Sequence, residues 1–250
     1  MKNILLFTIL ALFTQCKKSD SKTLKETKNQ QLFAENNYDF GGKVEFEMFS
    51  DSSYNFTLID KGFNYEKTEK FNGHCYLIKD TIYFKPLEFN YTNSEKAVIK
   101  NNFIEFISKE KSFRIEIKKS ALKIESQLDL TKFEDYAIFT YKPYDEDPDF
   151  KPYDINQMEL KEIDMILNKC FTENKSKLRN KNEYLKQCIA VTNLNNEQEV
   201  WIHCYCKSPH ADKSFKYNQI KMNDGGNCNI SVKINLTKKE YSQLIIAGLA

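Results

Sequence analysis

Hydrophobic and polar residues alternate along the chain from residue 38 to about residue 141. Val44, Phe46 and Met48, for example, are separated by charged residues. A period of two is typical of β-strands that turn one face to a core and the other to water. The same criterion predicts strands at residues 54–59, 75–78, 81–84, 103–107, 113–117, 122–124 and 136–141. Short strands joined by polar turns predict a β-rich domain at residues 37–142, a meander folded as a sandwich or an open barrel.

The pattern changes after residue 142. Residues 143–154 read PYDEDPDFKPYD, and proline at this density interrupts regular elements, which predicts a linker. Beyond the linker, apolar residues near a 3.6-residue spacing predict an amphipathic helix carrying Ile155, Met158, Ile163, Ile166, Leu167 and Cys170. Strands are predicted after the helix at about 185–192, 199–206 and 227–236, with a short closing element at 241–247. A helix across an antiparallel sheet would make residues 155–250 a small second domain, and we expect the α+β class for the chain.

The first sixteen residues have the features of an export signal. Lys2 provides a positive charge, residues 4–13 form an apolar run, and Cys16 follows. The run is too short to cross a hydrocarbon core of about 30 Å, so it predicts a removable signal. The segment resembles a bacterial lipoprotein signal of the Bacteroidetes type, although Phe13 and Gln15 depart from the usual leucine and small residue.

This resemblance implies that residues 1–15 are a signal peptide and that Cys16 is acylated, for example by palmitate. Each buried methylene of an acyl chain contributes about 0.8 kcal/mol, so several chains would hold the protein at a membrane. From Cys16 to residue 36 the sequence is polar, and we expect a flexible tether there. The expected localisation is the cell envelope, anchored to the outer membrane and facing the periplasm or the surface.

Composition narrows the choice of partners. The 250 residues include 37 Lys and Arg against 35 Asp and Glu, with the two signs interleaved. No strong field would therefore attract the protein to nucleic acid. The lipid anchor is the expected membrane contact, and the sequence contains no cofactor-binding motif.

Six cysteines follow Cys16, namely Cys75, Cys170, Cys188, Cys204, Cys206 and Cys228. An even set of thiols outside the cytoplasm is usually oxidised, and we expect the last five to be disulfide candidates. Cys204 and Cys206 lie on one face of the predicted strand VWIHCYC, so either could bond Cys228 on the neighbouring strand. Cys170 and Cys188 would then join the helix to the sheet.

Two alternatives use the same residues. Cys204, Cys206 and Cys228 could hold zinc with a fourth cysteine, although one residue between two ligands on a straight strand spreads them poorly. One thiol could instead be a nucleophile with His203 or His210 as its base, but His203 faces away from Cys204 on a regular strand. We favour the disulfides, and we expect neither a catalytic nor a metal site.

The C-terminal quarter carries a second resemblance. Within residues 184–250, the segments VWIHCYC, NDGGNC and NISVKINLTKKEYSQLIIAGLA are similar to the C-terminal segment of a recurrent group of Bacteroidetes secreted proteins and lipoproteins of unknown function. The resemblance implies that the protein is exported and that its cysteines have a structural role. We expect a lipid-anchored binding or structural module with a protein or glycan ligand. The alternative is a thiol- or zinc-dependent hydrolase built on Cys204, Cys206 and Cys228.

Overall fold

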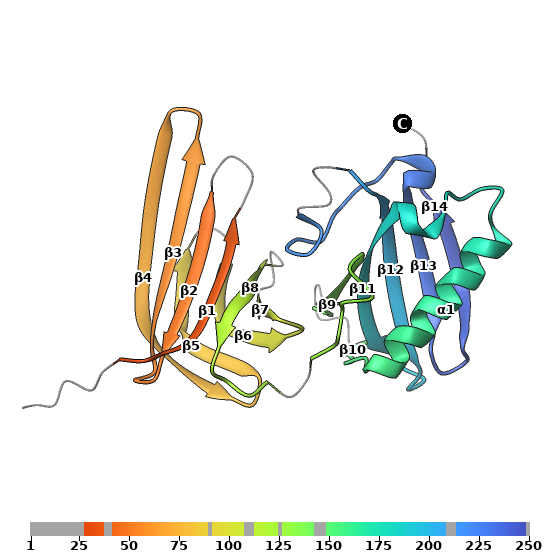
Figure 1. The fold of residues 1–250 in the computed structure, drawn as a ribbon. Coiled ribbons are helices and arrows are strands. Elements are labelled where there is room, and N and C mark those ends of the chain that lie inside the picture. The colour runs from red at the N-terminus through yellow and green to blue at the C-terminus, as the bar shows by residue number, and fades with distance from the viewer. Residues whose placement is uncertain are drawn as a thin grey trace, which may run out of the picture.

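The computed structural model of the chain has two parts lying side by side, a β-barrel and a sheet covered by one helix (Figure 1). It describes residues 28–37, 42–89, 92–107, 113–124, 127–142, 149–208 and 214–248. The predicted signal peptide and Cys16 lie outside the described residues, as does the start of the predicted linker at 143–148. Among the described residues, no helix has the length and apolar character that crossing a membrane requires.

The first part is a closed barrel of antiparallel strands in sequence order. Its strands are β1 (Gln30–Asn37), β2 (Lys43–Phe49), β3 (Ser53–Gly62), β4 (Tyr65–Ile78), β5 (Thr81–Phe89), β6 (Thr92–Lys100), β7 (Phe103–Phe106) and β8 (Phe113–Ser120). The prediction of a β-rich first part is confirmed, but the sandwich and the open barrel are wrong. The barrel closes because β1 pairs with β2 on one side and with β8 on the other.

The strand that closes the barrel lies in the segment predicted to be a tether. Residues 30–36 belong to β1, so the predicted tether at 16–36 extends too far. The inward positions of β1 are Leu32, Ala34 and Asn36. Ala34 is small and Asn36 is polar, so the hydrophobicity of the sequence does not show the alternation of this strand.

The barrel interior is packed with apolar side chains. On β2, Val44, Phe46 and Met48 are buried as the alternation predicted. Phe106 lies at the centre of an aromatic cluster, with its ring centroid 5.9 Å from that of Phe56 and 5.4 Å from that of Phe113. Tight interdigitation of such side chains is what a small barrel needs to fill its interior.

The second part is a six-stranded sheet covered on one face by a helix. Its elements are β9 (Tyr136–Thr140), β10 (Lys151–Pro152), α1 (Gln157–Glu173), β11 (Tyr184–Thr192), β12 (Gln198–Cys206), β13 (Asn229–Asn235) and β14 (Glu240–Ile246). The helix and the three strands after it match the predicted elements, and the closing element is strand β14. The sheet is larger than predicted, because β9 pairs in parallel with β11 and β10 adds a short antiparallel pair.

Helix α1 begins at a capping box. The Asn156 side chain accepts hydrogen bonds from the backbone N–H groups of Met158 and Glu159, and the Glu159 carboxylate accepts one from the Asn156 N–H. This arrangement satisfies backbone donors that a helix start leaves unpaired. The buried stripe of the helix is Leu160, Ile163, Ile166, Leu167, Cys170 and Phe171. Met158 was predicted on that stripe but is 77% exposed, because it lies in the first turn on the side away from the sheet.

One buried arginine joins the barrel to the sheet. Arg114 on β8 is 2% exposed, and its guanidinium carbon lies 4.2 Å from the ring centroid of Phe103 in the barrel and 3.7 Å from that of Phe139 on β9. Nη1 donates a hydrogen bond to the Ile138 carbonyl at 2.6 Å, and Nε donates one to the Lys216 carbonyl. Burial lowers the pKa of Arg114 to about 10, so the side chain stays charged at pH 7.

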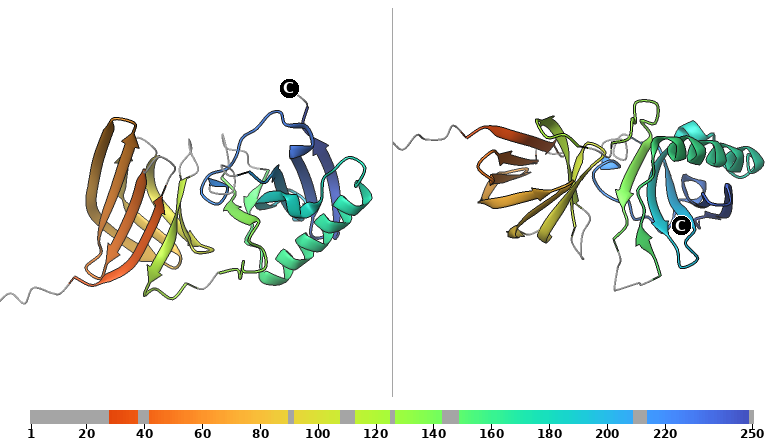
Figure 2. Two further views of the ribbon diagram at one scale, coloured as in Figure 1. Left: turned by 45° about the horizontal axis from the view of Figure 1, so that its top comes forward. Right: turned by 90° about the horizontal axis from the view of Figure 1, so that it is seen from below.

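Further polar contacts surround Arg114 where β7 and β8 face β9 (Figure 2). Glu105 on β7 is 2% exposed, accepts a hydrogen bond from the Thr140 N–H at 3.3 Å, and lies 3.7 Å from Lys142 Nζ. Other contacts also cross the junction, among them those between Lys100 and Asp154 and between Tyr217 and Glu116. Strand β9 belongs to the second sheet because it pairs with β11, so the predicted first domain at 37–142 includes a strand of the second part.

We predict that Arg114→Met lowers the free energy of unfolding by about 3 kcal/mol, because it takes a cationic partner away from the buried Glu105 carboxylate and leaves two carbonyls without donors. Urea denaturation at pH 7 measures the effect. Lys119→Met, an exposed position on the same strand, is the control and should stay within about 0.5 kcal/mol of the wild type. Equal effects of the two substitutions would contradict this role for Arg114.

Candidate functional site

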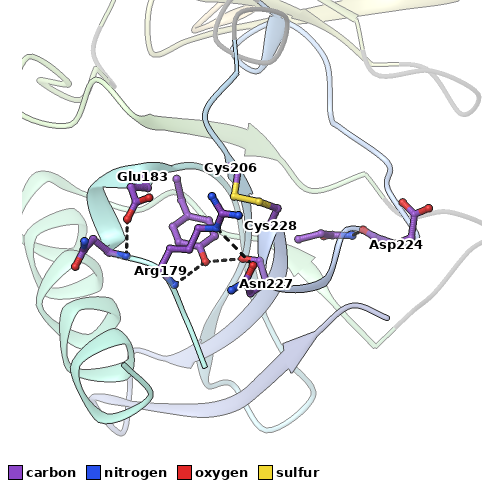
Figure 3. The surroundings of a disulfide bond; sticks show 9 residues. Arg179, Glu183, Cys206, Asp224, Asn227 and Cys228 are labelled. Atoms are coloured by element: carbon purple, nitrogen blue, oxygen red, sulfur yellow. Dashed lines mark hydrogen bonds between the residues drawn. A yellow bond between two sulfur atoms is a disulfide. The ribbon is translucent and has the colours of Figure 1, made fainter. Parts of the chain in front are cut away.

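The sequence-predicted cysteines divide into one disulfide and three buried thiols in the second part. Cys206 is bonded to Cys228, with 4.7 Å between their Cα atoms (Figure 3). Tyr205 pairs with Asn229 in the β12–β13 register, so Cys206 and Cys228 are the next opposed positions. This confirms one of the two predicted partners for Cys228.

The turn before β13 holds Cys228 in place. Gly225 adopts φ +108°, a left-handed conformation that suits glycine, and a short 3-10 turn follows at Gly226–Cys228. Tyr184 OH donates a hydrogen bond to the Asn227 carbonyl at 2.5 Å (Figure 3). The disulfide thus closes the end of β12 onto a turn that is already fixed.

The other predicted disulfides are wrong. Cys204 pairs in register with Ile230, two positions away from Cys228, so it cannot bond that residue. Cys170 and Cys188 are not bonded to each other; with Cys204 they are free thiols in the core between α1 and the sheet. Cys75 is also free, inside the barrel.

Burial makes these thiols poor nucleophiles. It raises the pKa of Cys170 to about 11 and that of Cys204 to about 12, and it raises the pKa of Cys188 well above its usual value. His203 lies on the opposite face of β12 from Cys204, as predicted, and His210 lies outside the described residues. The described part of the chain contains no group of three or more His, Cys, Asp or Glu side chains placed to hold a metal ion.

The described residues leave the opposite face of the same sheet partly uncovered. Near β9 and β11, this outer face is covered by Phe215 and Ile220. Over β12, β13 and β14 it carries a hollow of about 280 Å³. We call this the outer-face hollow, and its outward side chains are Trp201, His203, Ser231, Lys233, Gln243 and Ile245.

Trp201 is held in one position at the edge of the outer-face hollow. Its ring centroid lies 5.0 Å from that of Phe150 and 5.7 Å from that of Tyr141, both in edge-to-face geometry. The indole N–H donates a hydrogen bond to Glu199 at 3.3 Å, and Glu199 also forms an ion pair with Lys233 at 2.9 Å. The aromatic and ionic contacts fix this side chain before any ligand arrives, which lowers the entropy lost on binding.

The remaining polar groups of the hollow can both donate and accept hydrogen bonds. His203 Nδ1 lies 3.0 Å from Ser231 Oγ, and desolvation by the sheet lowers the pKa of His203, which favours the neutral ring. Gln243 on β14 is exposed, and Ile245 beside it is 50% exposed. The hollow therefore combines an indole and an aliphatic side chain with neutral and cationic polar groups.

Comparisons with protein-family models, with curated proteins and with solved structures found no match for this chain. The expected relationship to Bacteroidetes lipoproteins remains a prediction.

The outer-face hollow was not predicted from the sequence. The alternation placed Trp201 and His203 together on the face away from the cysteines, but it could not indicate which face of the sheet is uncovered.

We predict that Cys228→Ser lowers the free energy of unfolding by about 3 kcal/mol, because the disulfide closes a loop with a sequence separation of 22. Chemical denaturation with and without reductant measures the effect. Reduction should lower the stability of the wild type to that of the variant and leave the variant unchanged. Equal stabilities of the oxidised wild type and the variant would contradict the prediction.

Proposed function

We propose that this protein is a lipid-anchored binding module of the cell envelope and that its ligand is a short glycan segment bound in the outer-face hollow. The observation that carries the proposal is the uncovered sheet face with a fixed Trp201 beside several polar side chains. Binding sites for small ligands are concave, with apolar surface and a few placed polar groups. The outer-face hollow has this character.

A glycan matches the lining better than an apolar partner would. Sugar hydroxyls both donate and accept hydrogen bonds, and the side chains of His203, Ser231 and Gln243 do the same. The apolar C–H face of a sugar ring would contact Trp201 or Ile245, while Lys233 would donate to a hydroxyl or a carboxylate. A purely hydrophobic partner would cover the exposed Gln243 amide without offering it a hydrogen bond, at a cost of about 1–3 kcal/mol.

The hydrolase alternative has less support. A thiol- or zinc-dependent mechanism would use Cys204, Cys206 and Cys228, but two of these are bonded to each other. Cys204 is buried under α1, with its pKa raised to about 12, so it offers no thiolate at neutral pH. The binding module is therefore the proposal we carry forward.

The proposed anchor depends on the N-terminal sequence. The apolar run at residues 4–13 and the cysteine that follows it support acylation of Cys16. Strand β1 begins at Gln30, so the polar segment between the two would link the lipid to the barrel. This arrangement would hold the outer-face hollow close to a membrane surface, where envelope glycans are found.

We predict that Trp201→Ala abolishes glycan binding and that Gln243→Ala weakens it about fivefold, through the loss of about one hydrogen bond. The measurement is binding of labelled protein to an array of bacterial and host glycans, with melting temperatures to confirm folding. Tyr76→Ala, an exposed aromatic position on the barrel, is the control and should bind like the wild type. Absence of glycan binding, or binding that both hollow variants retain, would overturn the proposal.

We also predict that Cys16→Ala moves the protein from the membrane to the soluble fraction or leaves an uncleaved precursor, because the acylated residue is lost. Fractionation and intact mass measurement report both outcomes. Ser19→Ala, just after the proposed lipidation site, is the matched control. Membrane fractionation of Cys16→Ala identical to the wild type, with no change in processing, would refute the anchor.

A further inference from the structure

A second cavity lies at the junction between the barrel and β9, away from the outer-face hollow. It has a volume of about 150 Å³ and is lined by Asn101, Arg114, Glu116, Leu130, Ile138 and Lys216, among others. We call it the junction cavity. Its residues come from the β6–β7 turn, from β8, from the segment around β9 and from the chain after β12.

The junction cavity borders a buried side chain with an unused donor. Asn101 is 5% exposed, and its Oδ1 accepts a hydrogen bond from the Leu128 N–H at 3.1 Å. Its Nδ2 is buried and has no hydrogen-bond partner among the described residues. A buried polar group without a partner is unfavourable, and a bound acceptor would remove that cost.

Arg114 offers further donors at the same place. Its Nε and Nη1 atoms donate to backbone carbonyls, and no partner of Nη2 occurs among the described residues. A guanidinium with two free N–H groups on one nitrogen, next to an amide donor, is suited to the oxygens of an anion. Both side chains are held by backbone contacts, so the donors are positioned before binding.

The charges around the cavity also favour an anion. The buried carboxylate of Glu105 faces two cations, Arg114 and Lys142. Burial lowers the pKa of Lys142, Glu105 raises it in part, and repulsion by Arg114 lowers it further. In the lining itself, Glu116 is paired with Lys118 at 2.5 Å, so Arg114 and Lys216 are the cations that a ligand could neutralise. One negative charge beside Arg114 would offset the excess of positive charge around the cavity. A dianion would bring a second negative charge close to Glu116 and would be repelled by it.

We propose that the junction cavity binds a small aliphatic monocarboxylate, with its oxygens on Arg114, Asn101 and Lys216. A cavity of about 150 Å³ accommodates a molecule of about six non-hydrogen atoms. Leu130 and Ile138 provide an apolar wall for a short carbon chain, and Glu116 can accept a hydrogen bond from a hydroxyl on it. A short hydroxy acid has this size and this set of groups.

The test is a thermal-unfolding titration of the full mature chain with sodium lactate, at ionic strength held constant with sodium chloride. A ligand of the folded state raises the melting temperature in a saturable way. Lactamide, which has the same shape without the charge, is the ligand control and should have no effect.

Asn101→Asp is the sharpest variant, because it keeps the Oδ1 acceptor and replaces the free donor by a carboxylate that repels an anion. The backbone of Asn101 has φ +49°, which aspartate tolerates as asparagine does. We expect at least a tenfold loss of lactate affinity, about the effect of losing one hydrogen bond to a charged group. Asn72→Asp, at an exposed position on β4, adds the same charge and should respond to lactate like the wild type.

Lys216→Gln provides a second measurement if Asn101→Asp does not fold, because Lys216 lies in a half-buried loop. It should weaken lactate binding severalfold. A saturable lactate effect that both cavity variants reduce would support the proposal. No lactate effect, an equal effect of lactamide, or full retention of the effect in the cavity variants would overturn it, and none of these results bears on the outer-face hollow.

Discussion

The arrangement of the two parts depends on the burial of one charge, that of Arg114. Removing a guanidinium from water costs several kcal/mol unless rings, carbonyls and a carboxylate replace the water. The barrel supplies Phe103 and Glu105, and the second part supplies Phe139 and the carbonyls of Ile138 and Lys216. Neither part alone surrounds the charge, so the two are energetically coupled. Because Lys216 is one of the acceptors, the same contact places Phe215 against the outer face of β9 and β11.

This coupling explains why the two faces of the sheet differ. The inner face packs against α1 and the segments beside it, and the Cys206–Cys228 disulfide lies at the end of β12. Among the described residues, the outer face is covered where the chain after β12 returns to meet Arg114 and, at one edge, where Tyr141 and Phe150 pack on Trp201. Beyond that point, over β12 to β14, the face stays open and carries Trp201. The outer-face hollow and the junction cavity therefore both lie outside the packed cores. The barrel interior offers no comparable site, because its own aromatic side chains fill it.

Sequence periodicity predicted those features that depend on neighbours along the chain. It found the strands with large alternating residues, the helix and the antiparallel strands after it. It missed β1, where Ala34 and Asn36 face inward, and with it the closure of the barrel. It also missed β6, and the strand predicted at 122–124 is wrong. It also could not choose between Cys204 and Cys206, which share a face; the pairing of Tyr205 with Asn229 decides between them. Arg114 alternates with buried residues like any solvent-facing side chain, and only a contact distant in sequence makes it buried.

The two candidate sites differ in how a ligand would affect the fold. A carboxylate in the junction cavity would contact the guanidinium that both parts share, so its binding energy would add to the coupling between them. A glycan on β12 to β14 would contact one sheet that is already closed by α1 and the disulfide, and it would leave the junction unchanged. Occupancy of the junction cavity should therefore make unfolding of the barrel and the sheet more cooperative. Occupancy of the outer-face hollow should stabilise the second part alone.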